Sequence, residues 1–235
     1  MMFGHLAIGE LRRVCGNTLS VSVLEDNRCR YKRGNTTVIV PCDSVSIYPA
    51  PPIFYPEHIT NYIMIRFKEP IVVKPGSSEK FWTLVDFDVV AVVGSGSTSY
   101  EIVDAFPSTG MCKYALYGSP SRGILSRYIV TRVYGESKSE ECRATIAINI
   151  VNKSMKPVKI SRIVFPGHSF SLFYSQDSVI GSSLYVTVTS PFTAVVSLRE
   201  PSISNMHRAP RLIEQRVVAS VQPRWSQSFV MSYGL

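Results

Sequence analysis

The chain has 235 residues, of which 45% are hydrophobic and 18% charged, and its formal net charge is +8. These values exclude an intrinsically disordered chain, which has fewer apolar residues and a higher net charge per residue. They allow one large domain or two smaller ones, because a single domain usually has about 100–150 residues.

The N-terminal segment MMFGHLAIGELRRVCG lacks the pattern of a secretory signal, because charged residues interrupt it before an apolar run of sufficient length. The most apolar stretch of the chain, residues 89–93, is far shorter than the about 20 residues that cross a bilayer as a helix. We therefore expect a soluble, cytoplasmic protein without a transmembrane segment.

Short apolar or alternating runs predict β-strands in the first half of the chain, because successive side chains of a strand point to opposite faces of a sheet. The predicted strands are residues 36–40, 62–67, 81–93, 100–103, 111–117 and 124–133. Residues 48–56 carry four prolines and predict an extended loop. The run Gly94–Ser97 predicts a hairpin turn rather than a phosphate-binding loop, because neither a Lys-Ser/Thr pair nor a helix follows it.

A polar segment, GESKSEE at residues 135–141, predicts a boundary between two domains. The clearest strand of the chain follows it, with one apolar face formed by Ala144, Ile146, Ile148 and Ile150. The apolar positions after this strand change from even to odd numbers, which predicts a β-bulge near Ser161.

Further short strands are predicted at residues 170–174, 184–188 and 192–198, and one more at 216–221 in an irregular tail. No window shows a sustained helical period, so the sequence predicts an all-β fold. We expect two antiparallel, β-sandwich-like domains, residues 1–135 and residues 136–235.

The five cysteines are irregularly spaced, at Cys15, Cys29, Cys42, Cys112 and Cys142. They form neither the paired framework of a small secreted protein nor a CxxC metal motif. We expect reduced, partly buried thiols. An internal disulfide is the alternative, since intracellular proteins of hyperthermophiles are an exception to the rule that disulfides belong to oxidising compartments.

Two carboxylates, Asp86 and Asp88, lie two residues apart on a predicted strand and would share one face of it. A hairpin would bring Glu101 or Asp104 opposite them. Grouped carboxylates bind hard cations or perform acid and base chemistry, so a metal-dependent enzyme is one hypothesis. A solvated outer face is the simpler interpretation, because opposed like charges cost stability. We predict no catalytic residue, no metal and no cofactor.

Basic residues are concentrated in two parts of the chain. Residues 120–170 contain nine Lys or Arg and three Asp or Glu. Two basic stretches also contain aromatic residues, one at residues 28–33 and the other at Tyr128, Arg132 and Tyr134. Arginine and aromatic side chains on one strand face can bind phosphates and stack on bases, so nucleic acid or an anionic lipid surface is a second class of partner.

The segment KYALYGSPSRGILSRY at residues 113–128 combines a Leu116-Tyr117-Gly118 turn with Gly123 and Arg127-Tyr128. Together with Phe3-Gly4 and the later segment IAINIVNKSMKPVKISRIVF, it resembles an archaeal family described as domain of unknown function 432, over most of the chain. The resemblance implies an archaeal source and transfers no activity or catalytic residue. A tight connection between strands, with Tyr117 and Arg127 stacking or bonding across it, is the expected structure.

The sequence therefore favours a non-enzymatic binding or assembly module with a protein partner. Binding of nucleic acid or an anionic surface through a basic face is the alternative, and a metal-dependent enzyme that uses Asp86 and Asp88 is the third hypothesis. The expected binding residues are Tyr117, Arg122, Arg127, Tyr128 and Arg132.

Overall fold

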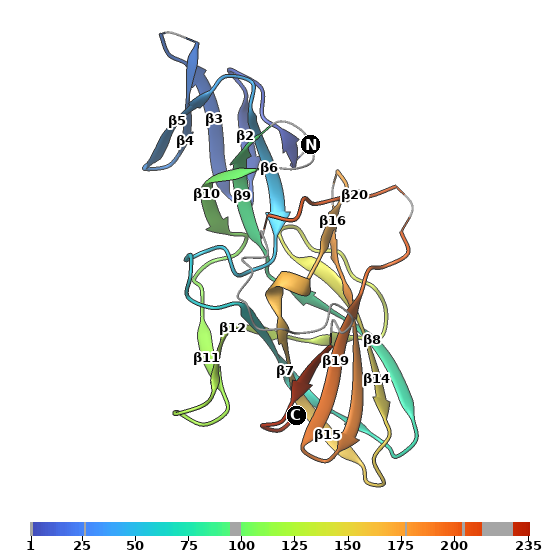
Figure 1. The fold of residues 1–235 in the computed structure, drawn as a ribbon. Helices are drawn as coiled ribbons and strands as arrows, with labels where there is room; N and C mark the ends of the chain where they lie inside the picture. Colours follow the sequence, from blue (N-terminus) through green and yellow to red (C-terminus); the bar gives the residue numbers. More distant parts are fainter. Residues whose placement is uncertain (1, 26, 95–99, 177, 204, 213–227) are drawn as a thin grey trace.

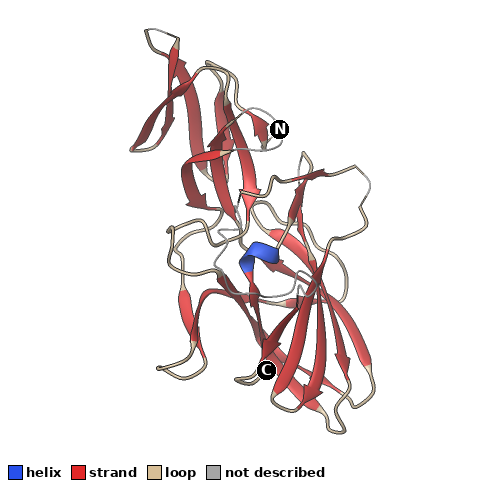
Figure 2. Cartoon of the chain, viewed as in Figure 1, coloured by secondary structure: helices blue, strands red, loops and turns tan. Residues whose placement is uncertain are grey.

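The computed structural model describes residues 2–25, 27–94, 100–176, 178–203, 205–212 and 228–235. Strands dominate this part of the chain, and its only helical segment is the short 3-10 turn η1 (Gly167–Ser169) (Figure 2). The predicted all-β fold is confirmed. No helix in the described ranges has the length and apolar character needed to span a membrane.

Two four-stranded sheets form an N-terminal sandwich, in the upper part of Figure 1. The outer sheet is an antiparallel meander of β2 (Leu11–Val14), β3 (Asn17–Val23), β4 (Arg28–Arg33) and β5 (Thr36–Pro41). The inner sheet has the order β1 (Gly4–His5), β6 (Val45–Ala50), β9 (Asp88–Val93) and β10 (Glu101–Pro107). Apolar, fully buried residues fill the interior between the two sheets, and among the largest are Leu19, Tyr31, Ile47 and Phe106.

The larger body below the N-terminal sandwich has two mixed sheets (Figure 1). The four-stranded mixed sheet has the order β11 (Tyr114–Tyr117), β12 (Ile124–Thr131), β7 (Tyr62–Val73) and β15 (Val158–Pro166). The main path of the nine-stranded sheet is β20 (His207–Arg208), β16 (Leu172–Tyr174), β17 (Val179–Gly181), β14 (Ala144–Asn152), β18 (Ser183–Ser190), β19 (Thr193–Arg199) and β21 (Ser228–Met231). The remaining two strands are β8 (Ser78–Val85), which pairs with β14, and β13 (Val133–Tyr134), which pairs with β8.

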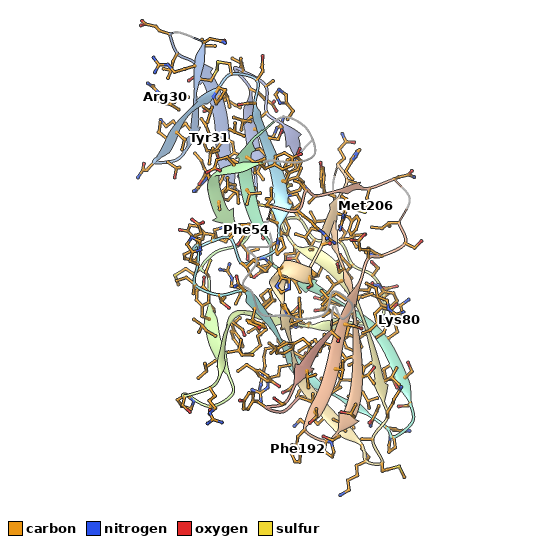
Figure 3. The ribbon with its side chains drawn as sticks, viewed as in Figure 1. Arg30, Tyr31, Phe54, Lys80, Phe192 and Met206 are labelled. Carbon is orange, nitrogen blue, oxygen red and sulfur yellow. A yellow bond between two sulfur atoms is a disulfide. The ribbon has the colours of Figure 1, made fainter. Side chains whose placement is uncertain are left out.

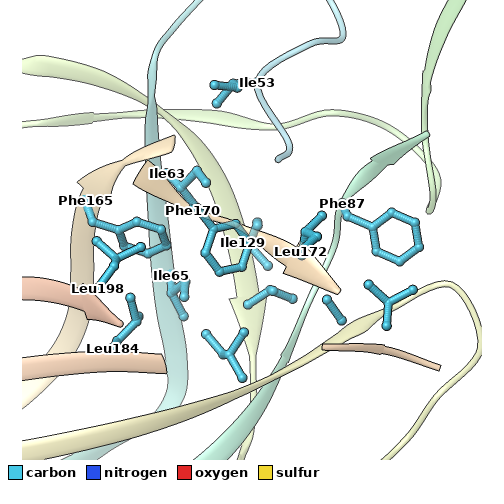
Figure 4. Packing of buried hydrophobic residues seen from close by; sticks show 14 of the residues in the cluster. Ile53, Ile63, Ile65, Phe87, Ile129, Phe165, Phe170, Leu172, Leu184 and Leu198 are labelled. Carbon is cyan, nitrogen blue, oxygen red and sulfur yellow. The ribbon is translucent and has the colours of Figure 1, made fainter. Parts of the chain in front are cut away.

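The core of the larger body follows the period-two pattern of its strands. The four predicted apolar positions of β14 are all fully buried, and the predicted bulge is confirmed by a change of register between Ile160 and Arg162 in the β15–β7 pair. Apolar side chains from both mixed sheets and from the η1 region meet in one cluster (Figure 4). Those labelled there include Ile63, Ile65, Phe165, Leu184 and Leu198.

Long-range pairing joins the two sides of the expected boundary at residues 135/136. β14 pairs with β8 over the full length of β8, and β15 pairs with β7. The structure thus differs from the expected division of the chain, because strands from both sides of residue 135 share two sheets. Among the described strands, three pairs are parallel, namely β12–β7, β14–β17 and β14–β18, and parallel pairs require long crossover connections.

Two disulfides replace the expected reduced thiols. Cys29 and Cys42 form a bridge within the N-terminal sandwich. Cys15, in the turn between β2 and β3, is bonded to Cys142, in the turn before β14, although 127 residues separate them in the sequence. Cys112 is a free thiol. The Cys15–Cys142 bridge therefore joins the N-terminal sandwich covalently to the larger body.

Two loop predictions need correction or lie partly outside the described residues. The proline-containing segment 48–56 is a strand up to Ala50, because β6 pairs with β9 as far as this residue, and it becomes a loop only from Pro51. β9 and β10 pair antiparallel on the two sides of the predicted Gly94–Ser97 turn, but residues 95–99 lie outside the described ranges, as does the predicted strand at 216–221.

Candidate functional site

Four basic side chains lie on the outward face of the outer sheet. The strand register fixes their positions, because Cys29, Tyr31 and Arg33 of β4 point inward and the alternate residues point outward. The side chains of Arg28, Arg30 and Lys32 on β4 are exposed, as is that of Arg13 on β2. We call these four residues the cationic face.

The neighbours of the cationic face are uncharged. Lys32 lies opposite Ser20 of β3 and Thr37 of β5, and Arg30 lies opposite Ser22 and Ile39. The other outward positions of the outer sheet are Leu11, Thr18 and Pro41, so none of them carries a carboxylate. A surface of one charge sign with hydroxyl donors beside it attracts anions.

The inward face of the same sheet carries a charged residue, Arg33, which is neutralised by a carboxylate of the inner sheet. Arg33 forms an ion pair with Asp104 of β10, with its Nε 2.6 Å from Oδ2, and lies over the ring of Phe106. Tyr31 is fully buried and donates a hydrogen bond to the same carboxylate. Burial raises the pKa of the Tyr31 hydroxyl, and Asp104 adds to the increase. Figure 3 shows Arg30 at the margin of the sheet and Tyr31 nearer its centre, so this aromatic ring is not available to stack on bases.

A buried ion pair lies where the N-terminal sandwich meets the larger body. Asp88, the first residue of β9, is fully buried, and one of its oxygens accepts hydrogen bonds from the backbone N–H groups of Phe54 and Tyr55. Its other oxygen, Oδ1, lies 3.7 Å from Nη2 of Arg127 on β12 and has no hydrogen-bond partner among the described residues. This arrangement connects three segments that are far apart in the sequence.

The guanidinium of Arg127 also fixes the loop before β7. It donates hydrogen bonds to the backbone carbonyl of Tyr55 and to the hydroxyl of Tyr114, at 2.8 and 3.3 Å. The free thiol of Cys112 contacts the same carbonyl, and burial raises the pKa of this thiol. Cys112 is therefore a protonated thiol in a structural junction rather than an activated nucleophile.

The pair formed by Asp88 and Arg127 is expected to make stability depend on pH. Burial raises the pKa of Asp88 from 3.8 to about 7, although Arg127 and two N–H groups favour the charged form. The folded state therefore holds a proton that the unfolded state has lost, so stability is highest below 3.8 and falls as pH rises through about 7. In the Asp88→Asn variant this part of the pH dependence should be absent when urea unfolding is measured from pH 4 to pH 8. Equal slopes in the two proteins would contradict the assignment.

The structure separates the carboxylates that were expected to lie on one strand face. The predicted strand 81–93 is interrupted between β8 and β9, so Asp86 forms an ion pair with Arg143 while Asp88 points into the interior. Asp88 is therefore not on a solvated outer face. Asp104 is opposite Ala91, and Glu101 is opposite Val93. Across the described ranges no three His, Cys, Asp or Glu side chains are grouped so that they could hold a metal ion.

The five residues predicted as a binding site do not form one surface. Tyr117 and Arg127 are buried, whereas Arg122 and Arg132 are exposed and Tyr128 is partly buried against the core. Arg122 is in the turn between β11 and β12, and Arg132 lies between β12 and β13. Tyr134 lies in β13, which pairs with β8, whereas Tyr128 lies in β12, which pairs with β7. The expected alignment of Tyr128, Arg132 and Tyr134 on one strand is therefore absent.

The segment from Tyr117 to Tyr128 is a packed corner. Tyr117 donates a hydrogen bond to the carbonyl of Gly234 and stacks edge-on against Tyr233. Arg162, not Arg127, lies over the Tyr117 ring. Gly118 has a φ of +112°, and an added Cβ there would come within 3.0 Å of both Gly123 and the Tyr233 ring. The tight turn therefore needs a glycine at this position.

The cationic face could have been found from the sequence. Residues 28–33 are basic, and an alternation of outward Arg28, Arg30 and Lys32 with inward Cys29 and Tyr31 follows from the period of a strand. No comparable signal marks the burial of Asp88 and Arg127, because their pairing depends on contacts between distant segments.

Comparisons with known proteins identify the family and give no activity. A search of curated proteins and a search of solved structures each found no match. A model of the family described as "Protein of unknown function (DUF432)" matches residues 2–232, which is nearly the whole chain. The chain therefore belongs to the DUF432 family.

Proposed function

We propose that the chain is a non-enzymatic binding module that holds an anionic partner on its cationic face. The observation that carries this proposal is the gathering of Arg13, Arg28, Arg30 and Lys32 on outward positions of one sheet that bear no carboxylate. Arg13, Arg30 and Lys32 have no ion-pair partner among the described residues, so their charge is available to a ligand.

The contrast with the buried charges supports this interpretation. Arg33, Arg127 and Arg143 each have a carboxylate of the chain within ion-pair distance. Carboxylates of the chain thus neutralise these three arginines, whereas Arg13, Arg30 and Lys32 have no ion-pair partner among the described residues. Exposed cations of one sign act over a Debye length of about 8–10 Å at moderate salt, which favours capture of an anion from solution.

Arg122 and Arg132 are the alternative location for the anion site, because both side chains are exposed. They belong to two different connections of the larger body. With the family resemblance, we also propose an archaeal source and a cytoplasmic location. Neither proposal is needed for the binding test.

Salt dependence of binding provides that test. We expect the protein to bind heparin and duplex DNA at low salt, and log K for DNA to fall against log salt with a slope of roughly −0.9 per phosphate contacted. The variant Arg13→Gln/Arg30→Gln/Lys32→Gln should weaken binding and flatten the slope. A matched control, Arg122→Gln/Arg132→Gln/Lys159→Gln, removes the same charge from exposed positions of the larger body and should change the slope little.

Two results would contradict the proposal. Retention of neither polyanion at low salt would show that the cationic face does not capture anions. A loss of binding in the control variant but not in the cationic-face variant would place the site on the larger body, at Arg122 and Arg132.

A further inference from the structure

The strand at the edge of the cationic face is open to another strand. β5 pairs with β4 along its whole length without a change of register, and no other strand in the described ranges pairs with it. Figure 1 shows β5 at the outer margin of the N-terminal sandwich. An edge strand presents a row of backbone N–H and C=O groups that can form a ladder with a further chain.

β5 lacks the features that usually protect such an edge. Its sequence, TTVIVP, has no charged residue, and its proline is at the last position. Ile39 is 60% exposed on the outward face. The opposite edge strand of the same sheet, β2, is shorter and carries Arg12 and Arg13. Charge, interior proline and short length prevent edge pairing in natural sheets, so only β2 is protected in this way.

We propose that an extended acidic peptide adds to β5 as a fifth strand of the outer sheet. This inference rests on the proposed function and names the partner of the same surface. The peptide backbone would bond to β5, as in other cases of β-strand addition, while alternate acidic side chains lie on the cationic face. Neighbouring strands are about 4.8 Å apart, so Arg30 and Lys32 on β4 would be about 10 Å from the peptide, with only Ile39 and Thr37 between. Long basic and acidic side chains can meet across this uncharged row.

An acidic peptide fits the charge and the open edge better than a second copy of the chain or a nucleic acid does. A second copy of the chain pairing through β5 would place the Arg30 and Lys32 of both copies in one continuous sheet with no carboxylate among the outward residues between them, so the charge of the cationic face would not be neutralised. Nucleic acid would satisfy the charge but has no peptide groups to continue the ladder, and the ring of Tyr31 on β4 is directed inward. An acidic peptide can both form backbone hydrogen bonds with β5 and neutralise the cationic face.

The test compares peptides of equal charge that differ in their backbone hydrogen bonds. A fluorescent peptide of about eight residues, alternating Glu and Val, is titrated with the full chain at low salt. Two further peptides carry N-methyl groups on every second residue. One is methylated at the odd positions and the other at the even positions, so that the methyl groups of only one of them point toward β5. We expect one methylated frame to lose affinity about tenfold or more, because it removes several ladder bonds, and the other frame to bind like the parent. Arg30→Gln/Lys32→Gln should weaken the parent peptide and reduce its dependence on salt.

The possible outcomes distinguish backbone pairing with β5 from electrostatic binding to the cationic face. If both methylated peptides bind like the parent, there is no strand addition, while the anion-binding function stands. If heparin and DNA bind but the peptide does not, the partner is nucleic acid or another polyanion and the inference is overturned. If no anion binds, the proposed function fails as well. If the free protein sediments as a dimer and the Ile39→Lys variant sediments as a monomer, the edge belongs to a second copy instead.

Discussion

The Arg127→Met variant is expected to lose about 3–5 kcal/mol of unfolding free energy, because it leaves the fully buried Asp88 carboxyl without the cationic partner that favours its charged form. The side chain of Arg127 is only 4% exposed, and that of Asp88 is fully buried. The substitution also removes the hydrogen bonds to the Tyr55 carbonyl and the Tyr114 hydroxyl. Urea or guanidinium unfolding followed by fluorescence at pH 7.5 would measure the loss.

A control variant and a double-mutant cycle show whether the lost stability comes from the interaction between Asp88 and Arg127. Arg122→Gln, at an exposed turn, should change stability by no more than about 0.5 kcal/mol. The double variant Asp88→Asn/Arg127→Met should be less destabilised than the sum of the two single variants, because neither buried partner is then left without the other. An Arg127→Met protein as stable as the Arg122→Gln protein would show that the junction contributes nothing to stability.

Removal of the Cys15–Cys142 disulfide is expected to lower the free energy of unfolding by about 2–5 kcal/mol. The bridge closes a loop of 127 residues, and in the chain-entropy description longer loops give larger stabilisation. The Cys15→Ser/Cys142→Ser variant would be compared with the unmodified chain in guanidinium without reductant. Cys112→Ser is the matched control, since Cys112 is a free thiol and its replacement leaves both bridges in place.

Reductant gives a second measure of the same effect. Dithiothreitol should destabilise the unmodified chain and the Cys112→Ser protein more than the Cys15→Ser/Cys142→Ser protein, in which only the Cys29–Cys42 bridge can still be reduced. Equal losses in all three proteins would show that the bridge between the sandwich and the larger body does not contribute to stability.

The local parts of the fold could be predicted, and its long-range pairing could not. The alternation of β14 and the bulge at Ser161 follow from the requirement that one face of a strand be apolar. The pairing of β8 with β14 was not predicted, because the polar segment 135–141 between them has the composition of a linker and nothing local encodes which distant strands meet. The disulfide partners were unpredictable for the same reason, since spacing along the chain does not determine distance in space.

The candidate site was predicted in part. The basic composition of residues 28–33 indicated an anionic partner, and the structure adds the outward direction of Arg28, Arg30 and Lys32. Arginine is seldom buried without a partner, and the partner of Arg127, Asp88, is 39 positions away on another sheet, so no local pattern indicates that Arg127 is buried. Composition can therefore indicate an exposed charge, whereas a buried pair requires the tertiary contacts.

The interleaving of the two bodies also determines the order in which the chain can fold. The N-terminal sandwich needs β9 and β10, which follow β7 and β8 in the sequence, while β7 and β8 need β15 and β14. Synthesis therefore completes the sandwich only after two strands of the larger body have emerged without their partners. Because such contacts are distant in the sequence, loop-closure entropy opposes them until late, which is typical of slowly folding β-proteins. The apolar faces of β7 and β8 remain open during that interval, and they are the part of the nascent chain most exposed to misassembly.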